Sequence, residues 1–231
     1  MFVDGRHVLS RERCVTCGAC ARVCFNGALE IAGRHMPVDD VLAEVMRDAP
    51  FYAQSGGGVT VSGGEPLAHD SFAHALLSAA KSRGLHTALD TSGFCPWEPL
   101  DGLSRCVDLF LYDIKHMDPE KHLLLTGVSN ERILDNLGRL SEAGKPVWIR
   151  VPLIPGLNDE EANYHAMGRW FSTLKSVERI EILRYHPLAA SKYERMGGDY
   201  RLKRLEPPPA TVAESRRRLL ASYGLREVVW R

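Results

Sequence analysis

Hydrophobic and polar residues alternate along the chain with two periods, one helical and one typical of strands. After Pro37, apolar residues at positions 38, 41, 42, 45 and 46 follow the spacing of an amphipathic helix. Short β-branched or apolar runs predict strands at 58–62, 85–90, 107–112, 147–151, 180–185 and 228–230. Helices are predicted between them, near 69–83, 129–143, 159–175 and 210–223. This order of strand, helix and strand predicts an α/β fold with a parallel sheet or barrel.

Polar residues follow the predicted strands at their carboxyl ends. In a parallel barrel these ends gather on one face, so we expect the side chains to line one pocket. They are Glu65, Asp90, Thr91, Asp113, Lys115, Arg150 and His186. Gly63 and Gly64 precede Glu65 and allow close approach of a ligand to the backbone. Their carbonyl groups and the Glu65 carboxylate together suit an ammonium group.

Composition and charge exclude several classes of protein. The 231 residues are 45% hydrophobic, enough for a full core, and Lys+Arg and Asp+Glu both total 29. This balance gives no support to nucleic-acid binding. No apolar run is long enough to span a membrane, and residues 1–13 lack the apolar stretch of a signal peptide. We therefore expect a cytoplasmic protein with no nucleic-acid or membrane partner.

Four cysteines near the start are spaced C-x2-C-x2-C-x3-C, namely Cys14, Cys17, Cys20 and Cys24. This spacing is the bacterial ferredoxin run that ligates a 4Fe-4S cluster. A structural zinc site is the alternative, although zinc sites usually divide four cysteines into two separated pairs. Cys95 and Cys106 stand alone and are interpreted as small buried hydrophobic residues.

Six segments resemble the glycyl-radical-enzyme activating enzymes, which are radical S-adenosylmethionine proteins related to the activator of pyruvate formate-lyase. They are GGGVTVSGGEPL (56–67), LDTSGF (89–94), DLFLYDIKHMD (108–118), TGVSNERILDNL (126–137), RVPLIPGLND (150–159) and YHPLAASKYERMG (185–197). The resemblance covers nearly the whole chain in the right order. It implies a partial (β/α)6 barrel.

By the same resemblance, the pocket binds S-adenosylmethionine, whose reductive cleavage by a 4Fe-4S cluster yields a 5′-deoxyadenosyl radical. That radical takes a hydrogen from a glycine of a partner, a glycyl radical enzyme, and a flavodoxin or ferredoxin donates the electron. The residues implied in binding are Ser62, Gly63, Gly64, Glu65, Asp90, Thr91, Asp113, Ile114, Lys115, Arg150 and His186.

The sequence departs from the family pattern at its N-terminal end. The family places its catalytic cluster on a Cys-x3-Cys-x2-Cys loop after the first barrel strand, and these 231 residues contain no such triplet. We expect residues 1–36 to be half of a two-cluster ferredoxin-like insertion, and residues 37–231 to be a barrel without its first strand. A wrongly assigned or incomplete gene start, a split enzyme, and a non-catalytic electron carrier or S-adenosylmethionine-binding remnant each account for this pattern.

An ordinary barrel enzyme is a further alternative, for example an aldolase in which Lys115 forms a Schiff base. That hypothesis leaves both the cysteine run and the GGE segment unexplained. Trapping of a carbonyl substrate on Lys115 by borohydride would support it.

The cysteine pattern predicts the metal content. We expect at most one cluster, with about four irons per chain, after purification under argon. We also expect no 5′-deoxyadenosine after reduction with dithionite in the presence of S-adenosylmethionine, because the catalytic triplet is absent. Chemical iron analysis and chromatography of the products check both. About eight irons per chain, or substantial 5′-deoxyadenosine, would contradict this interpretation.

Overall fold

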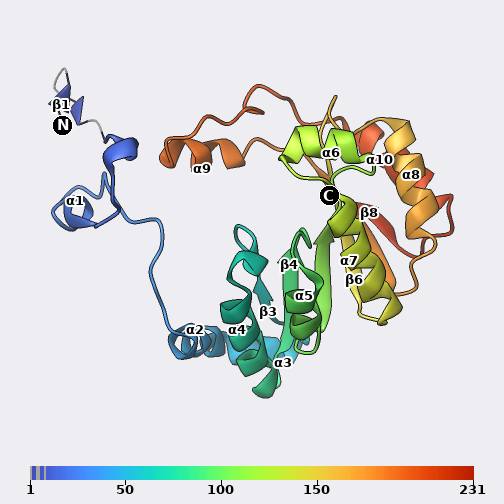
Figure 1. The fold of residues 1–231 in the computed structure, drawn as a ribbon, viewed down its shortest axis with the longest axis horizontal. Coiled ribbons are helices and arrows are strands. Elements are labelled where there is room, and N and C mark those ends of the chain that lie inside the picture. Colours follow the sequence, from blue (N-terminus) through green and yellow to red (C-terminus); the bar gives the residue numbers. More distant parts are fainter. Residues whose placement is uncertain (1, 4–5, 8) are drawn as a thin grey trace.

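A six-stranded parallel sheet forms the centre of the computed structural model, which describes residues 2–3, 6–7 and 9–231 (Figure 1). Each strand pairs with the next one along the chain, in the order β3-β4-β5-β6-β7-β8. The strands are β3 (Gly58–Val61), β4 (His86–Thr91), β5 (Leu109–Asp113), β6 (Val147–Leu153), β7 (Val177–Arg184) and β8 (Val228–Trp230). The predicted α/β class, with a sheet of parallel strands, is confirmed.

Helices connect successive strands. The α-helices are α2 (Val38–Val45), α3 (Ala49–Ser55), α4 (Asp70–Ser82), α5 (Trp97–Ser104), α6 (Pro119–Thr126), α7 (Glu131–Glu142), α8 (Glu161–Phe171), α9 (Ala189–Arg195) and α10 (Ala210–Ala221). Short 3-10 turns are η2 (Met46–Asp48) and η3 (Pro66–His69). The sequence pattern did not predict α3, α5, α6 or α9. In α6, Leu123 and Leu124 are exposed, so the helix has no apolar stripe to reveal it.

The hydrophobic core lies between the sheet and the helices that cover one of its faces. Phe110, Tyr112, Ile149 and Val151 are fully buried and alternate with less buried positions along β5 and β6. They belong to one cluster with apolar side chains of α4, α5, α7, α8 and α10. A smaller cluster joins α2 to α4 through Leu42 and its neighbours. The other face of β4, β5 and β6 is therefore free to carry polar side chains.

The cysteine run lies in an N-terminal segment that Figure 1 shows apart from the sheet. It contains β1 (Phe2–Val3), β2 (Arg6–His7), η1 (Arg11–Arg13) and α1 (Ala19–Arg22). Arg11 Nη2 donates to the Arg195 carbonyl at 2.6 Å, and Arg195 forms an ion pair with Glu30. The segment thus contacts the end of α9, far along the chain. A domain boundary after residue 36 stays a prediction.

Among the residues that the structure describes, no helix is both long and apolar enough to cross a membrane.

One glycine is required by close packing beside the site. Gly93 has φ +70°, and a Cβ built on it would lie 1.7 Å from Tyr112 Oη. Tyr112 is buried, and its hydroxyl donates to the Ile133 carbonyl at 2.7 Å. Any side chain at position 93 must therefore displace a buried tyrosine and strain the backbone.

We expect Gly93→Ala to destabilise the protein by about 3 kcal/mol, because overpacking and left-handed backbone strain add together. Gly102→Ala is the matched control. Gly102 lies in α5, and a Cβ there meets no atom within 4 Å. That change should instead stabilise the protein by up to about 1 kcal/mol. Urea unfolding measures both, and equal stability of the two variants would contradict the packing argument.

Candidate functional site

A cavity of about 280 Å³ opens at the carboxyl ends of β3, β4, β5 and β6. Its lining residues are Ser62, Gly63, Gly64, Glu65, Asp90, Thr91, Ser92, Asp113, Lys115 and Arg150. Nine of these ten are residues that the sequence predicted for one pocket, so the fold brings most of the predicted set together. Whether these residues bind S-adenosylmethionine stays a prediction at this point.

Two predicted residues do not line this cavity. Ile114 is 1% exposed and packs in the main hydrophobic core. His186 follows β7, one strand beyond the last strand that contributes to the lining, and its side chain is exposed. Ser92, by contrast, lines the cavity although the sequence analysis did not select it. Its place directly after Asp90 and Thr91 is the signal that could have found it.

Arg150 joins two carboxylates across three neighbouring strands. Its Nη2 donates to Asp90 Oδ1 at 2.7 Å, and both Nε and Nη2 donate to Asp113 Oδ1 at 3.1 Å. Asp113 and Arg150 are register partners in β5 and β6, which explains why they meet. Ser62 Oγ donates to the other oxygen of Asp90 at 2.7 Å. The floor of the cavity is therefore a connected network of charges.

Burial sets the ionisation behaviour of Asp113. Desolvation raises the pKa of this carboxyl above its ordinary value, and nearby Asp90 adds to the effect, whereas Arg150 and Lys115 oppose it. Lys115 Nζ lies 3.8 Å from Asp113 Oδ2. The two cations thus offset only part of the desolvation of the carboxylate, and the pKa of Asp113 stays raised.

Glu65 ties the glycine loop to the end of β4. Its Oε1 accepts from Thr91 Oγ1 at 2.7 Å and from the Leu67 amide at 3.2 Å. Its Oε2 accepts from the Ser92 amide at 2.9 Å and from Ser92 Oγ at 2.6 Å. Four donors are about as many as a carboxylate can accept. In this structure Glu65 positions the loop, and direct contact of its carboxylate with an ammonium group stays a prediction.

The glycines leave space beside this network. A Cβ added to Gly63 or Gly64 would meet no atom within 4 Å, and Gly63 has φ +131°, which side chains rarely adopt. The two residues therefore keep the backbone open at the cavity wall.

A larger cavity of about 750 Å³ adjoins the first one. Asp113 and Lys115 belong to both linings. The rest of its wall combines apolar and polar side chains, namely Leu124, Leu125, Thr126, Pro152, Ile154, Leu157, Asn158, Tyr193, Asp199, Tyr200, Arg201 and Leu202. These residues come from the end of α6, the end of β6 with the β6–α8 connection, and α9 with the segment after it.

The four cysteines of the predicted cluster site are not drawn together. Cys14, Cys17 and Cys20 are exposed, and Cys24 is half-buried. The Thr16 amide donates to Cys14 Sγ at 3.4 Å. Within the described part of the chain, no group of three or more His, Cys, Asp or Glu side chains is arranged to hold a metal ion. The thiols fit a cluster by their chemistry but not by the geometry of this structure, so we derive no reaction step through a cluster on them.

Comparison with known proteins supplies the family. Residues 12–166 match the model of the radical SAM superfamily. Over 181 residues, the chain is 41% identical to the pyruvate formate-lyase-activating enzyme of Staphylococcus epidermidis, covering 76% of this chain and 72% of the relative. This chain belongs to the radical SAM superfamily, among the glycyl-radical-enzyme activating enzymes. The resemblance seen in the six sequence segments is thereby confirmed.

Two further relatives support the assignment. The trans-4-hydroxy-L-proline dehydratase activating enzyme of Clostridioides difficile is 39% identical over 242 residues, covering 91% of this chain and 80% of the relative. A crystal structure of a domain of pyruvate-formate lyase-activating enzyme from Bacteroides vulgatus superposes with a TM-score of 0.64 and 33% identity. That match covers 75% of this chain and 98% of the solved one. The sheet described above is accordingly the partial barrel of radical SAM enzymes.

We expect Arg150→Met to destabilise the protein by about 3 kcal/mol at neutral pH, because Asp90 and Asp113 would lose the cation between them. The raised pKa of Asp113 should rise further in this variant. A carboxyl whose folded pKa is raised lowers stability above that pKa, so the deficit should shrink as the pH falls through the folded pKa toward the ordinary Asp range. Urea unfolding at several pH values between 7.5 and 4.5 measures this trend.

Arg105→Met is the control for this change, because Arg105 pairs with Asp101 on the surface at 3.7 Å and is 80% exposed. Its loss should cost less than about 1 kcal/mol at every pH. A deficit in Arg150→Met that stays constant with pH would contradict the charge argument.

Proposed function

We propose that the smaller cavity binds S-adenosylmethionine and that the protein activates a glycyl radical enzyme. The main support is the network in which Arg150 lies between Asp90 and Asp113, next to the glycine backbone that no side chain covers. Such a site offers both anionic and cationic groups within one small space. It suits a zwitterionic amino-acid group, which S-adenosylmethionine carries at its methionine end.

The formal charges of the cavity and the ligand are complementary. The three carboxylates of Glu65, Asp90 and Asp113 outnumber the two cations of Lys115 and Arg150, which leaves one negative charge. At neutral pH, S-adenosylmethionine carries a sulfonium, an ammonium and a carboxylate, and hence one net positive charge. Binding would therefore neutralise the site, which favours this ligand electrostatically.

Each residue then has a role that its chemistry allows. Asp90 and the carbonyl groups of Gly63 and Gly64 accept hydrogen bonds from the ammonium group, whereas Arg150 and Lys115 face the carboxylate. When bound, S-adenosylmethionine supplies a sulfonium that one-electron reduction cleaves, and this cleavage is the source of the radical chemistry. The protein orients the ligand and withholds it from water.

The N-terminal cysteines are the candidate ligands of an iron-sulfur cluster. We propose, from their ferredoxin spacing, that Cys14, Cys17, Cys20 and Cys24 hold one auxiliary 4Fe-4S cluster, and that a flavodoxin or ferredoxin is the electron donor of the protein. These 231 residues contain no Cys-x3-Cys-x2-Cys triplet, so no residue of this chain is assigned to the reductive cleavage itself. Ligand binding and partner binding are therefore the properties to test first.

The larger cavity is the proposed entry for the partner's glycine. It shares Asp113 and Lys115 with the smaller cavity, so a segment lying in it would come next to bound S-adenosylmethionine. Its wall presents exposed apolar groups such as Leu124, which is 84% exposed. The relatives named above are named for pyruvate formate-lyase and trans-4-hydroxy-L-proline dehydratase. We infer a protein partner of this glycyl radical class for the present chain.

Two variants should separate ligand binding from partner binding. Lys115→Met should weaken S-adenosylmethionine binding by about tenfold through loss of a charge-assisted contact. Leu124→Glu should leave that affinity unchanged but weaken binding of the partner by about tenfold or more, because a charged side chain replaces an apolar contact. Calorimetry measures the first affinity. Biolayer interferometry with a glycyl radical enzyme encoded near this gene measures the second.

Leu188→Glu serves as the control, since Leu188 is 74% exposed but does not line the larger cavity. It should change neither affinity. If the unmodified chain shows no calorimetric binding of S-adenosylmethionine, the proposed function is wrong.

A further inference from the structure

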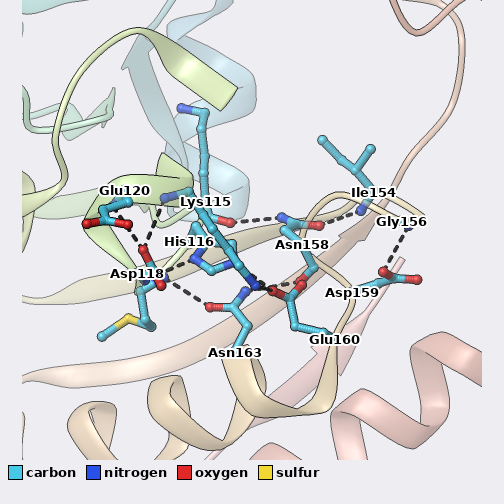
Figure 2. Close-up of polar contacts among 12 residues, drawn as sticks. Lys115, His116, Asp118, Glu120, Ile154, Gly156, Asn158, Asp159, Glu160 and Asn163 are labelled. Carbon is cyan, nitrogen blue, oxygen red and sulfur yellow. Dashed lines mark hydrogen bonds and ion pairs between the residues drawn. The ribbon is translucent and has the colours of Figure 1, made fainter. Parts of the chain in front are cut away.

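The connection between β5 and α6, residues 114–118, is held by polar side chains from other parts of the chain (Figure 2). It contains no helix or strand of its own, yet its backbone groups have defined partners. The side-chain Nδ2 of Asn130 donates to the backbone carbonyls of His116 and Met117 at 2.9 and 2.8 Å. Asn163 Oδ1 accepts from the Met117 amide at 3.0 Å. Two asparagines thus replace the hydrogen bonds that regular structure would supply.

Asn158 links this connection to the next one, between β6 and α8. Its Nδ2 donates to the Lys115 carbonyl at 2.9 Å and to the Pro152 carbonyl at 2.6 Å. Its Oδ1 accepts from the Ile154 amide at 2.8 Å. Asn158 is 2% exposed, so water cannot easily replace these partners. One side chain therefore fixes the carbonyl of Lys115 relative to β6.

His116 and Glu160 make a second link between the same two connections. The Asp118 amide donates to His116 Nδ1 at 2.9 Å, so Nδ1 must be the unprotonated acceptor. His116 Nε2 then carries the proton and donates to Glu160 Oε1 at 3.0 Å. His116 is 2% exposed, and Glu160 also pairs with Lys121 at the surface. Figure 2 shows this histidine and the glutamate pointing toward one another beneath Lys115.

These contacts surround Lys115, which lines both cavities together with Asp113. Lys115 extends beyond the end of β5, so the sheet hydrogen bonds do not fix its backbone. His116, Glu160 and Asn163 line neither cavity and have no direct access to a ligand there. Asn158 lines the larger cavity but not the smaller one. We therefore expect these side chains to influence the smaller cavity through the backbone that carries Lys115.

We propose that Asn158 and the His116–Glu160 pair are positioning residues that hold the Lys115 ammonium at the wall between the two cavities. The effect on ligand binding rests on the proposed function, whereas the effect on the place of Lys115 does not. Without these contacts the protein folds but Lys115 loses its defined position. The ammonium then samples solvent and meets an anionic ligand group less often.

The test observes the Lys115 side chain directly by NMR. The protein is grown with ¹³C-lysine, and the Cε signal of Lys115 is assigned by its absence in Lys115→Met. We expect this signal to move toward the shift of solvent-exposed lysines in Asn158→Asp and in Glu160→Leu. Asn158→Asp keeps the size of the side chain and its acceptor for Ile154 but removes both donated hydrogen bonds.

Two controls leave the positioning contacts in place. Glu160→Gln retains an acceptor for His116, so its Lys115 signal should match that of the unmodified protein. Lys121→Met removes only the exposed partner of Glu160 and should also leave the signal unchanged. Melting temperatures establish which variants are folded. Should Asn158→Asp fail to fold, Glu160→Leu compared with Glu160→Gln decides the outcome.

Calorimetry with S-adenosylmethionine provides the second measurement. Asn158→Asp should weaken binding about fivefold on its own, yet add nothing in a Lys115→Met background, because it acts through Lys115. Further weakening in that background would show general damage and overturn the proposal. An unchanged Lys115 signal in folded Asn158→Asp and Glu160→Leu would also overturn it. If S-adenosylmethionine does not bind the unmodified protein, the proposed function fails while the spectra still decide the positioning role.

Discussion

The pairing of Arg150 with two carboxylates on neighbouring strands is the interaction on which the site depends. Asp113 and Arg150 are register partners, and Asp90 pairs with Leu111, two residues before Asp113. Because side chains alternate between the faces of a strand, these three charges emerge on the same face. A slip of one residue in any of these strands would turn a charge toward the hydrophobic core. The register that buries the core therefore also assembles the site.

Beyond the strand ends, side chains take over the task of fixing the backbone. Glu65 holds the glycine loop against Thr91 and Ser92, and Asn158 holds the Lys115 carbonyl against the β6–α8 connection. Buried backbone groups outside regular structure need such partners, because leaving them unpaired costs free energy. The same hydrogen bonds that satisfy these loops also restrict where their functional side chains can lie. The same hydrogen bonds therefore stabilise the loops and position the side chains that the loops carry.

Much of this arrangement could be predicted from the sequence, because strands and their carboxyl ends follow from local patterns. Residues at or after the carboxyl ends of β3, β4, β5 and β6 were predicted to share a pocket, and nine of the predicted residues, two of them glycines, line the cavity. His186 does not line it. The prediction failed there because a sequence pattern places a residue at the end of a strand but does not give the curvature of the sheet. Asn158 and Asn163 were missed, because long-range bonds from a side chain to a distant loop leave no periodic signal.

The two cavities are built from different parts of the fold. The charged residues of the smaller cavity stand on the sheet or directly after it, where register and buried hydrogen bonds fix them. Much of the mixed apolar and polar wall of the larger cavity belongs instead to the end of α6 and to residues 193–202, which lie outside the sheet. Substitutions in such peripheral segments are tolerated more easily than changes in the sheet. If the proposed roles of the two cavities hold, a fold of this kind can change its protein partner while it keeps the charges proposed to bind the small molecule. Asp113 and Lys115 belong to both walls and therefore join the two cavities.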